Sequence, residues 1–172
     1  MVSKTKIVVG VLGVLILVLA VTLMLNKEGL DQRKEMMTNA TINIKIDGEE
    51  NILSFDDLKK AGEEKFEAVL DTSTTDPVVY AYTGVQLKNV LKDQGINLEG
   101  KTAVILTAVD GFTVAYSLEE VLLEGNVYVT YAREGEKLKS KEDGGRGPYQ
   151  TIVVGDQFSS RRCKWLTSIE VQ

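Results

Sequence analysis

The sequence has no histidine and only one cysteine, Cys163, among its 172 residues. Without histidine, the chain lacks the most frequent general base and the commonest metal ligand. One cysteine cannot close an intrachain disulfide, so cysteine pairing says nothing about the compartment. Arg162 and Lys164 flank Cys163 and favour a lowered thiol pKa, but we interpret this cysteine as a small buried residue of a strand.

Positive charge is also scarce. The chain has 20 Lys and Arg against 25 Asp and Glu, with a net charge of −5, and residues 26–172 hold 18 basic and 25 acidic residues. Such an acidic chain lacks the basic footprint that nucleic-acid binding requires, so we expect no nucleic-acid partner. Between Arg133 and Lys164, however, eight basic residues outnumber five acidic ones.

Long apolar runs are confined to the N-terminal end. Residues 7–25 form a stretch of 19 residues without charge, 14 of them Leu, Ile or Val. As a helix it would span roughly 28 Å, close to the hydrocarbon thickness of a bilayer. We therefore predict a cytoplasmic N-terminus at 1–6, a transmembrane anchor at 7–25 and a juxtamembrane stalk at 26–40.

The alternative is a cleaved signal peptide. Its apolar core would be shorter and would end in a small-residue cleavage site, whereas this run ends in Leu-Met-Leu-Asn. Lys4, Lys6 and the free amine precede the run and favour an N-terminus inside the cell. The expected location is the cell membrane, single-pass, with the C-terminal domain outside the cytoplasm of a bacterial cell.

From residue 41 onward the pattern is that of short strands. Residues 101–122 form a compact unit in which a strand, an Asp110-Gly111 turn and a returning strand lead into a helix capped by Ser117, with Glu120 three residues on. Similar patterns predict strands at 42–46, 50–53, 65–72, 78–82, 126–132, 149–154 and 163–171, and helices at 55–60 and 87–94. Residues 72–77 are expected to be a loop.

Eight or nine short strands and three short helices predict an α+β domain with a β-dominated core over residues 41–172. We expect its core to gather residues from several strands: Ile42, Ile44, Val104, Leu106, Val129 and Ile152, with Trp165 near them.

Three sequence segments occur in a characteristic order. They are YTGVQLKNVLKDQGI (82–96), VDGFTVAYSLEEVL (109–122), and a C-terminal part that runs YVTYAREGEKL, a Gly-rich loop, GPYQTIVVG and RRCKWLTSIEV. This order resembles the oxidoreductase molybdopterin-binding domain family, which has the sulfite-oxidase fold. The resemblance covers residues 42–171 and implies that fold for nearly the whole domain.

The resemblance also has departures. Catalytic members hold molybdenum through a cysteine upstream of the Gly-Val-x-Leu helix, and residues 66–82 here contain none. The family's phosphate-binding arginine after the Gly-Pro-aromatic step is Gln150. The resemblance therefore allows a bound molybdopterin, but we expect no metal and assign no catalytic residue.

The resemblance also implies that the C-terminal loops face the phosphate of the pterin. The residues it points to for binding a pterin phosphate or another anion are Arg146, Tyr149, Arg161, Arg162 and Lys164. We expect the three arginines to converge with the backbone N–H groups of residues 144–147 on one anion-binding concavity. The competing interpretation is an ordinary solvated loop surface.

Two functions remain open from the sequence. One is a degenerate, non-catalytic binding module for an anionic small molecule or a membrane protein partner, held at the membrane by the N-terminal helix. The other is a molybdopterin-dependent oxidoreductase.

Overall fold

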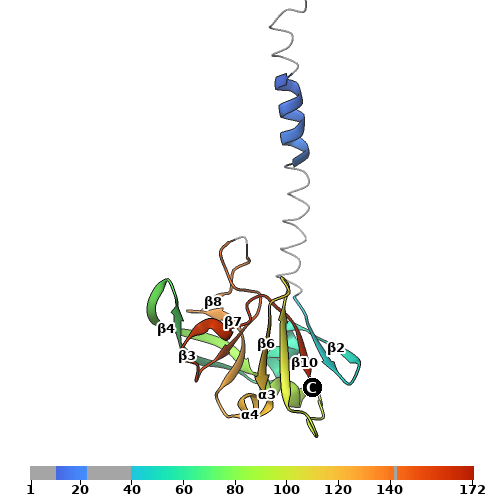
Figure 1. The fold of residues 1–172 in the computed structure, drawn as a ribbon, viewed down its shortest axis with the longest axis vertical. Helices are drawn as coiled ribbons and strands as arrows, with labels where there is room; N and C mark the ends of the chain where they lie inside the picture. Colours follow the sequence, from blue (N-terminus) through green and yellow to red (C-terminus); the bar gives the residue numbers. More distant parts are fainter. Residues whose placement is uncertain (1–10, 23–39, 142) are drawn as a thin grey trace, which may run out of the picture. The chain divides into compact units, whose positions relative to one another are not determined.

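The computed structural model describes residues 11–22, 40–141 and 143–172. Residues 11–22 are helical, and in the parts of the chain that are described no helix is long and apolar enough to cross a bilayer. The predicted anchor at 7–25 lies partly, and the predicted stalk at 26–40 almost wholly, outside the described residues. The domain from residue 40 onward is described by itself (Figure 1).

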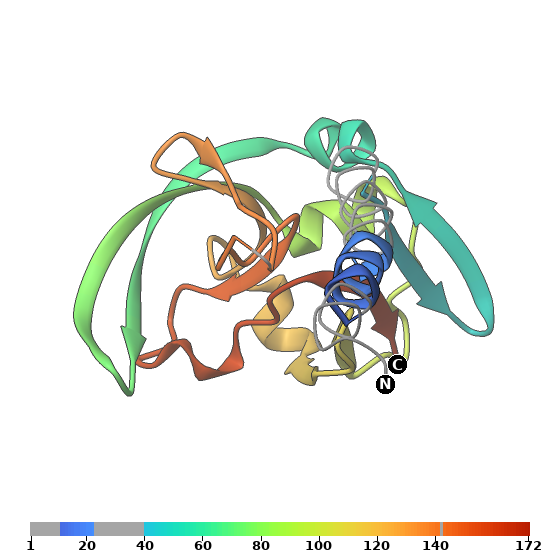
Figure 2. The ribbon, with the colours of Figure 1, turned by 90° about the horizontal axis from the view of Figure 1, so that it is seen from above.

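The domain is built from two five-stranded sheets and a few short helices (Figures 1 and 2). The first sheet has the order β2-β1-β10-β5-β6, and the second has the order β3-β4-β7-β8, with β9 also paired to β7. The strands are β1 Ile42–Ile46, β2 Glu49–Leu53, β3 Glu63–Thr72, β4 Thr75–Gln86, β5 Ala103–Ala108, β6 Thr113–Ser117, β7 Val127–Arg133, β8 Glu136–Lys137, β9 Gln150–Val153 and β10 Leu166–Val171. The helices are α2 Phe55–Lys60, α3 Leu87–Asp93, α4 Leu118–Leu122 and the 3-10 turn η1 Ser159–Arg161. This β-rich α+β arrangement agrees with the fold class predicted for the domain.

The main core joins residues of both sheets and the helices. Of the predicted core residues, Ile42, Ile44, Val104, Leu106 and Val129 are all buried in it. The prediction is wrong for Ile152, which packs in a second, smaller cluster with Ala68 and Tyr82. It is also wrong for Trp165, which is partly exposed and lies outside both clusters.

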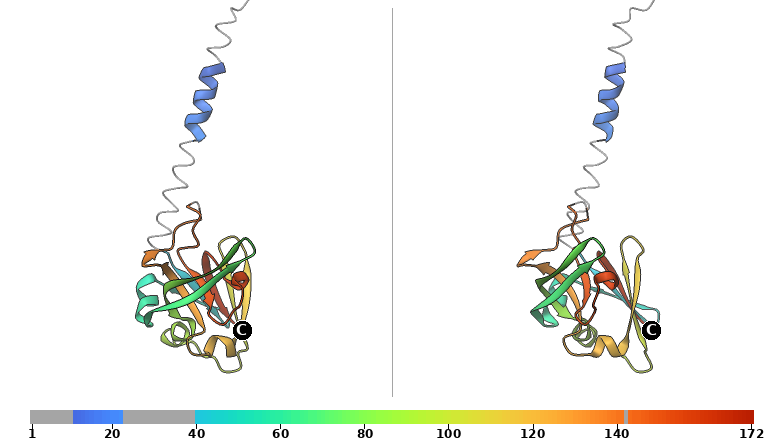
Figure 3. Two further views of the ribbon diagram at one scale, coloured as in Figure 1. Left: turned by 90° about the vertical axis from the view of Figure 1, so that its left-hand side faces the viewer. Right: turned by 60° about the vertical axis from the view of Figure 1, so that its left-hand side comes forward.

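Local signals in the sequence place the helices correctly. Ser54 and Ser117 each cap a helix, and their hydroxyl oxygens accept hydrogen bonds from Asp57 N (3.2 Å) and Glu120 N (3.1 Å). Helix α3 buries its apolar residues and is followed by Gly95, whose φ of +65° suits the end of a helix. Helices α3 and α4 lie together at one end of the domain (Figure 3).

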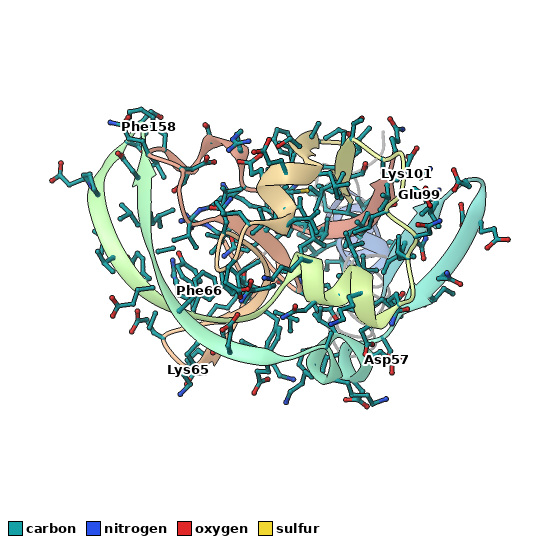
Figure 4. All side chains as sticks on the ribbon, turned by 90° about the horizontal axis from the view of Figure 1, so that it is seen from below. Asp57, Lys65, Phe66, Glu99, Lys101 and Phe158 are labelled. Atoms are coloured by element: carbon teal, nitrogen blue, oxygen red, sulfur yellow. The ribbon has the colours of Figure 1, made fainter. Side chains whose placement is uncertain are left out.

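Strands β3 and β4 form a long curved arm, which differs from the predicted loop at 72–77. Pairing continues from Glu63–Val85 to Thr72–Thr75, so the two strands meet almost at the turn. Pro77 is tolerated in β4 because β4 pairs with β7 only over Tyr82–Gln86, which leaves one edge of the arm free at Pro77. Phe66 lies on the inner side of this arm (Figure 4).

The last strand is shorter than predicted. β10 begins at Leu166, and its register against β5 shifts between Leu166 and Ser168. This bulge places Leu166, Ile169 and Val171 in the core, so buried and exposed residues do not alternate strictly along the strand. Residues 162–165 therefore lie outside β10, and Arg162 and Lys164 belong to a side-chain cluster beside the second sheet.

Candidate anion-binding site

Three basic residues from two segments of the chain lie close together beside the second sheet. Arg146 lies in the loop between β8 and β9, Arg162 follows η1, and Lys164 lies just before β10. Lys164 forms an isolated antiparallel bridge with Gln150, the first residue of β9. We call Arg146, Arg162 and Lys164 the cationic cluster.

Arg162 is fixed against the inner face of the arm. It is only 6% exposed. Its Nη1 donates to the hydroxyl of Tyr82 (3.0 Å), and its Nη2 donates to the carbonyl of Val69. The guanidinium carbon lies 5.4 Å from the centroid of the Tyr82 ring. A guanidinium has five N–H donors, so donors remain for a ligand.

The three cations lie close enough to disfavour one another's charge. Burial lowers the pKa of Lys164, and the neighbouring Arg146 and Arg162 lower it further. Burial likewise lowers the pKa of Arg146, with the positive charges of Arg133 and Arg162 as further causes. Within the described residues, none of the ion pairs includes a member of the cationic cluster.

Unpartnered polar groups lie in the same region. Arg146 Nη1 is buried and makes no hydrogen bond, and both the Nε2 and the Oε1 of Gln150 are buried and unpaired. Residues opposite each other in an antiparallel pair project to the same face, so the Gln150 amide lies on the side of Lys164. A buried polar group without a partner costs about 1–3 kcal/mol, so these groups favour a polar partner such as a water molecule or an anion.

Arg161 does not share in this arrangement, contrary to the expected convergence of three arginines. Its Nε donates to Asp156 Oδ2 (3.0 Å) and its Nη1 to Glu120 Oε2 (3.1 Å), while its Nη2 contacts both carboxylates. These carboxylates raise the pKa of Arg161. Its guanidinium carbon lies 5.4 Å from the ring of Tyr116, in β6. Arg161 therefore already has its anions within the protein.

Two further expectations about this site are wrong. Tyr149 is buried in the main core, and its hydroxyl donates to the carbonyl of Ala40 (2.9 Å). The glycine N–H groups of the 144–147 loop are used internally: Gly145 N donates to Ser140 O (2.7 Å) and Gly147 N to Lys139 O (2.9 Å). These two backbone N–H groups are therefore not available to bind an anion.

A pocket of about 670 Å³ opens beside the cationic cluster. It lies between the turn of the arm, the β5–β6 turn and the η1 segment, and Arg162 and Lys164 form part of its wall. Phe158, which precedes η1, lies near the turn of the arm (Figure 4) and lines the pocket. The sequence did not lead us to predict Phe158 or Phe112 as site residues. The available signal was an aromatic residue within a polar loop.

Cys163 is not placed to act as a metal ligand. It is completely buried in the main core, and burial raises the pKa of its thiol to about 12. The thiolate is the form that binds metals. Within the described residues, no group of three or more His, Cys, Asp or Glu side chains is arranged to hold a metal ion.

Comparison with known proteins decides the family. The oxidoreductase molybdopterin binding domain matches residues 32–172. The chain belongs to this family. Among solved structures, it is similar to the sulfane dehydrogenase SoxCD from Paracoccus pantotrophus, with a TM-score of 0.62 and 15% sequence identity. The match covers 76% of this chain and 37% of that one, and at 15% identity it shows the fold alone. No match was found among curated proteins.

The residues of this family member fit only part of a molybdenum cofactor. The cationic cluster and the buried Gln150 amide suit an oxyanion such as a phosphate. Asp71, Thr72 and Ser73 of the pocket wall lie within residues 66–82, the segment in which the resemblance places the metal-binding cysteine, and a hydroxyl or carboxylate does not replace a thiolate as a soft ligand. The anionic part of the cofactor is matched, and its metal is not.

Proposed function

We propose that this domain is a non-catalytic binding module for an anionic ligand, held by Arg146, Arg162 and Lys164. The observation that carries the proposal is that these three buried or half-buried cations have no carboxylate partner among the described residues. Like charges in proximity disfavour one another, and an oxyanion between them would reverse that effect. Arginine suits this role because its planar fork pairs with two oxygen atoms at once.

A calorimetric titration of the full-length protein with inorganic phosphate tests the proposal. A charge-assisted hydrogen bond contributes about 1.5–3 kcal/mol, so Lys164→Met should weaken phosphate binding by roughly 10- to 150-fold. Arg161→Ala is the matched control, because its guanidinium is already paired with carboxylates, and it should leave the affinity unchanged. Absence of binding to the wild type, or equal binding by both variants, would refute the proposal.

The second candidate function is a molybdopterin-dependent oxidoreductase, which family membership favours. The absent thiolate argues against it. Metal analysis of protein purified from cells that make the cofactor distinguishes the two functions. We expect no molybdenum. Stoichiometric molybdenum together with an extractable pterin would contradict the non-catalytic function and show that another group holds the metal.

We further propose that the domain is tethered to the cell membrane by residues 7–25 and lies outside the cytoplasm. The uncharged length of this run and the lysines that precede it support this topology. Protease added to cells with a permeabilised outer layer should digest the domain. Digestion only after lysis would reverse the orientation, and a mature N-terminus near residue 26 would show that the run is a cleaved signal.

A further inference from the structure

The strand registers of the first sheet show what lies at the end where the chain enters the domain. Ala40, the first described residue of the domain, lies just before β1, and β1 runs parallel to β10 with Asn43 opposite Ser168. β10 in turn pairs with β5, so that Leu166 lies opposite Ala108. The turn between β5 and β6 therefore lies at the same end as the start of β1, away from α3 and α4 (Figure 3).

The loop between β8 and β9 is held at this end as well. Tyr149, just after the loop, donates from its hydroxyl to the carbonyl of Ala40 (2.9 Å). Trp165 links the loop to the β5–β6 turn, because its Nε1 donates to Gly145 O (3.2 Å) and its carbonyl accepts from Val109 N (3.0 Å). We call residues 109–112 and 139–147 the proximal face.

The β5–β6 turn exposes two large apolar side chains. Val109 is 60% exposed and Phe112 is 45% exposed, although Gly, Asn, Asp and Ser dominate turns. The acid between them, Asp110, is already compensated: its Oδ1 accepts from Phe112 N (3.2 Å), and Lys141 Nζ lies 3.3 Å from its Oδ2. Asp110 therefore opposes the transfer of the turn out of water less than a free carboxylate would. We call Val109 and Phe112 the apolar tip.

Charge differs between the two ends of the first sheet. At the opposite end, residues 45–50, Lys101 and residues 170–172 line one hollow, with two basic and four acidic residues among them. The proximal face and the adjoining residues 162–165 hold five basic and three acidic residues. The domain as a whole holds 15 basic and 22 acidic residues, so an anionic surface repels most of it and favours an approach by the proximal face.

We infer that the proximal face contacts an anionic phospholipid bilayer, with the apolar tip among the headgroups and Lys139 and Lys141 next to anionic lipids. This inference rests on the proposed tether by residues 7–25 and adds a second, non-covalent contact. The 14 residues from 26 to 39 reach at most about 50 Å when fully extended. The tether would therefore keep the proximal face near the bilayer and make the contact intramolecular, so that a small apolar tip is sufficient.

The test reports the surroundings of residue 109 in the full-length protein, reconstituted into vesicles of phosphatidylcholine and phosphatidylglycerol. Val109→Cys should fold normally and accept an NBD fluorophore selectively, because Val109 is largely exposed and Cys163 is completely buried. Val109 does not line the pocket beside the cationic cluster. We expect lipids that carry a nitroxide on the acyl chain to quench this label. Leu123→Cys, 61% exposed at the end of α4, is the matched control and should stay unquenched.

Replacing one lysine tests the electrostatic part of the contact. Lys139 is exposed and forms no ion pair within the described residues. Lys139→Gln should lower the ratio of contacting to free domain about fivefold, equivalent to about 1 kcal/mol for one lysine beside an anionic surface. Lys92→Gln removes the same charge from α3 and should change nothing. In phosphatidylcholine alone, Lys139→Gln should have no effect.

The outcomes separate this contact from the tether. If the protein floats with the vesicles but the labels at 109 and 123 are quenched equally, the inference is overturned and the tether stands. A blue-shifted emission at 109 without lipid quenching would show that a protein, such as a second copy of the chain, covers the apolar tip, and would also overturn the inference. Failure of the chain to float with the vesicles would overturn both.

Discussion

Replacing Arg161 with alanine should lower the stability of the domain without weakening the anion site. Four hydrogen bonds join its guanidinium to Glu120, at the start of α4, and to Asp156, in the loop after β9. Removal of the arginine would break all four. It would also leave two carboxylates facing each other, each about one-fifth exposed.

The magnitude follows from the exposure of the three side chains. An exposed ion pair contributes about 0.2–1 kcal/mol, whereas a charge-assisted hydrogen bond in a protected site contributes about 1.5–3 kcal/mol. The Arg161 side chain is 39% exposed, so solvent screens part of the attraction. We therefore expect Arg161→Ala to reduce the free energy of unfolding by roughly 1–2.5 kcal/mol.

Urea denaturation followed by circular dichroism measures this change as a shift of the midpoint at constant slope. The control is Lys92→Ala, an exposed residue of α3 for which no ion pair is present among the described contacts. Glu120→Gln should be less harmful in the Arg161→Ala background than in the wild type, because the two side chains interact directly. A midpoint for Arg161→Ala equal to that of Lys92→Ala would show that this network contributes nothing.

Four further outcomes are expected. Ile44→Ala, which truncates a fully buried side chain, should cost about 2–5 kcal/mol, and Ile52→Ala on the neighbouring strand, where the side chain is 69% exposed, should be nearly neutral in the same thermal melt. Gly84→Ala should destabilise by about 1–3 kcal/mol, because a Cβ there would lie 2.5 Å from the carbonyl oxygen of Val129; a wild-type urea midpoint would contradict the pairing of β4 with β7. Phosphate affinity should fall as the pH rises through the pKa of Lys164, because only the protonated ammonium attracts the anion. Burial and two neighbouring guanidinium groups hold this pKa below its ordinary value. A constant phosphate affinity across the alkaline range would show that Lys164 does not bind the anion. Arg146→Met should raise the melting temperature of the ligand-free protein while weakening phosphate binding.

The sequence allowed much of the secondary structure to be predicted because the decisive signals are local. The Ser117 cap, the Asp110-Gly111 turn and the apolar face of α3 each depend on residues within a few positions of one another. The length of the arm depends instead on pairing between β3 and β4, and a polar stretch such as residues 72–77 gives no sign that it is paired. The bulge in β10 likewise follows from the partner strand rather than from the sequence of β10.

The site was predicted only in part, for the same reason. Arg161 and Arg162 are adjacent and chemically identical, so composition and spacing treat them alike. In the structure, Arg162 donates a hydrogen bond to the Tyr82 hydroxyl, whereas Arg161 forms ion pairs with Glu120 and Asp156. Whether an arginine is available to a ligand depends on which carboxylates the fold brings to it, and Glu120 lies 41 positions away from Arg161 in the sequence.

The expected gain in stability on replacing Arg146 follows from the energetics of the cluster. A charged group that is withdrawn from water needs compensating charges or hydrogen bonds. Arg146 Nη1 is buried without a partner, and its closest charged neighbours in the cluster are cations. A methionine would replace the aliphatic part of the arginine side chain and would not bury a charge. If the ligand-free protein were instead destabilised by Arg146→Met, the guanidinium would have to be stabilised within the folded chain itself. That result would show that the positive charge of the cluster does not need an anion to balance it.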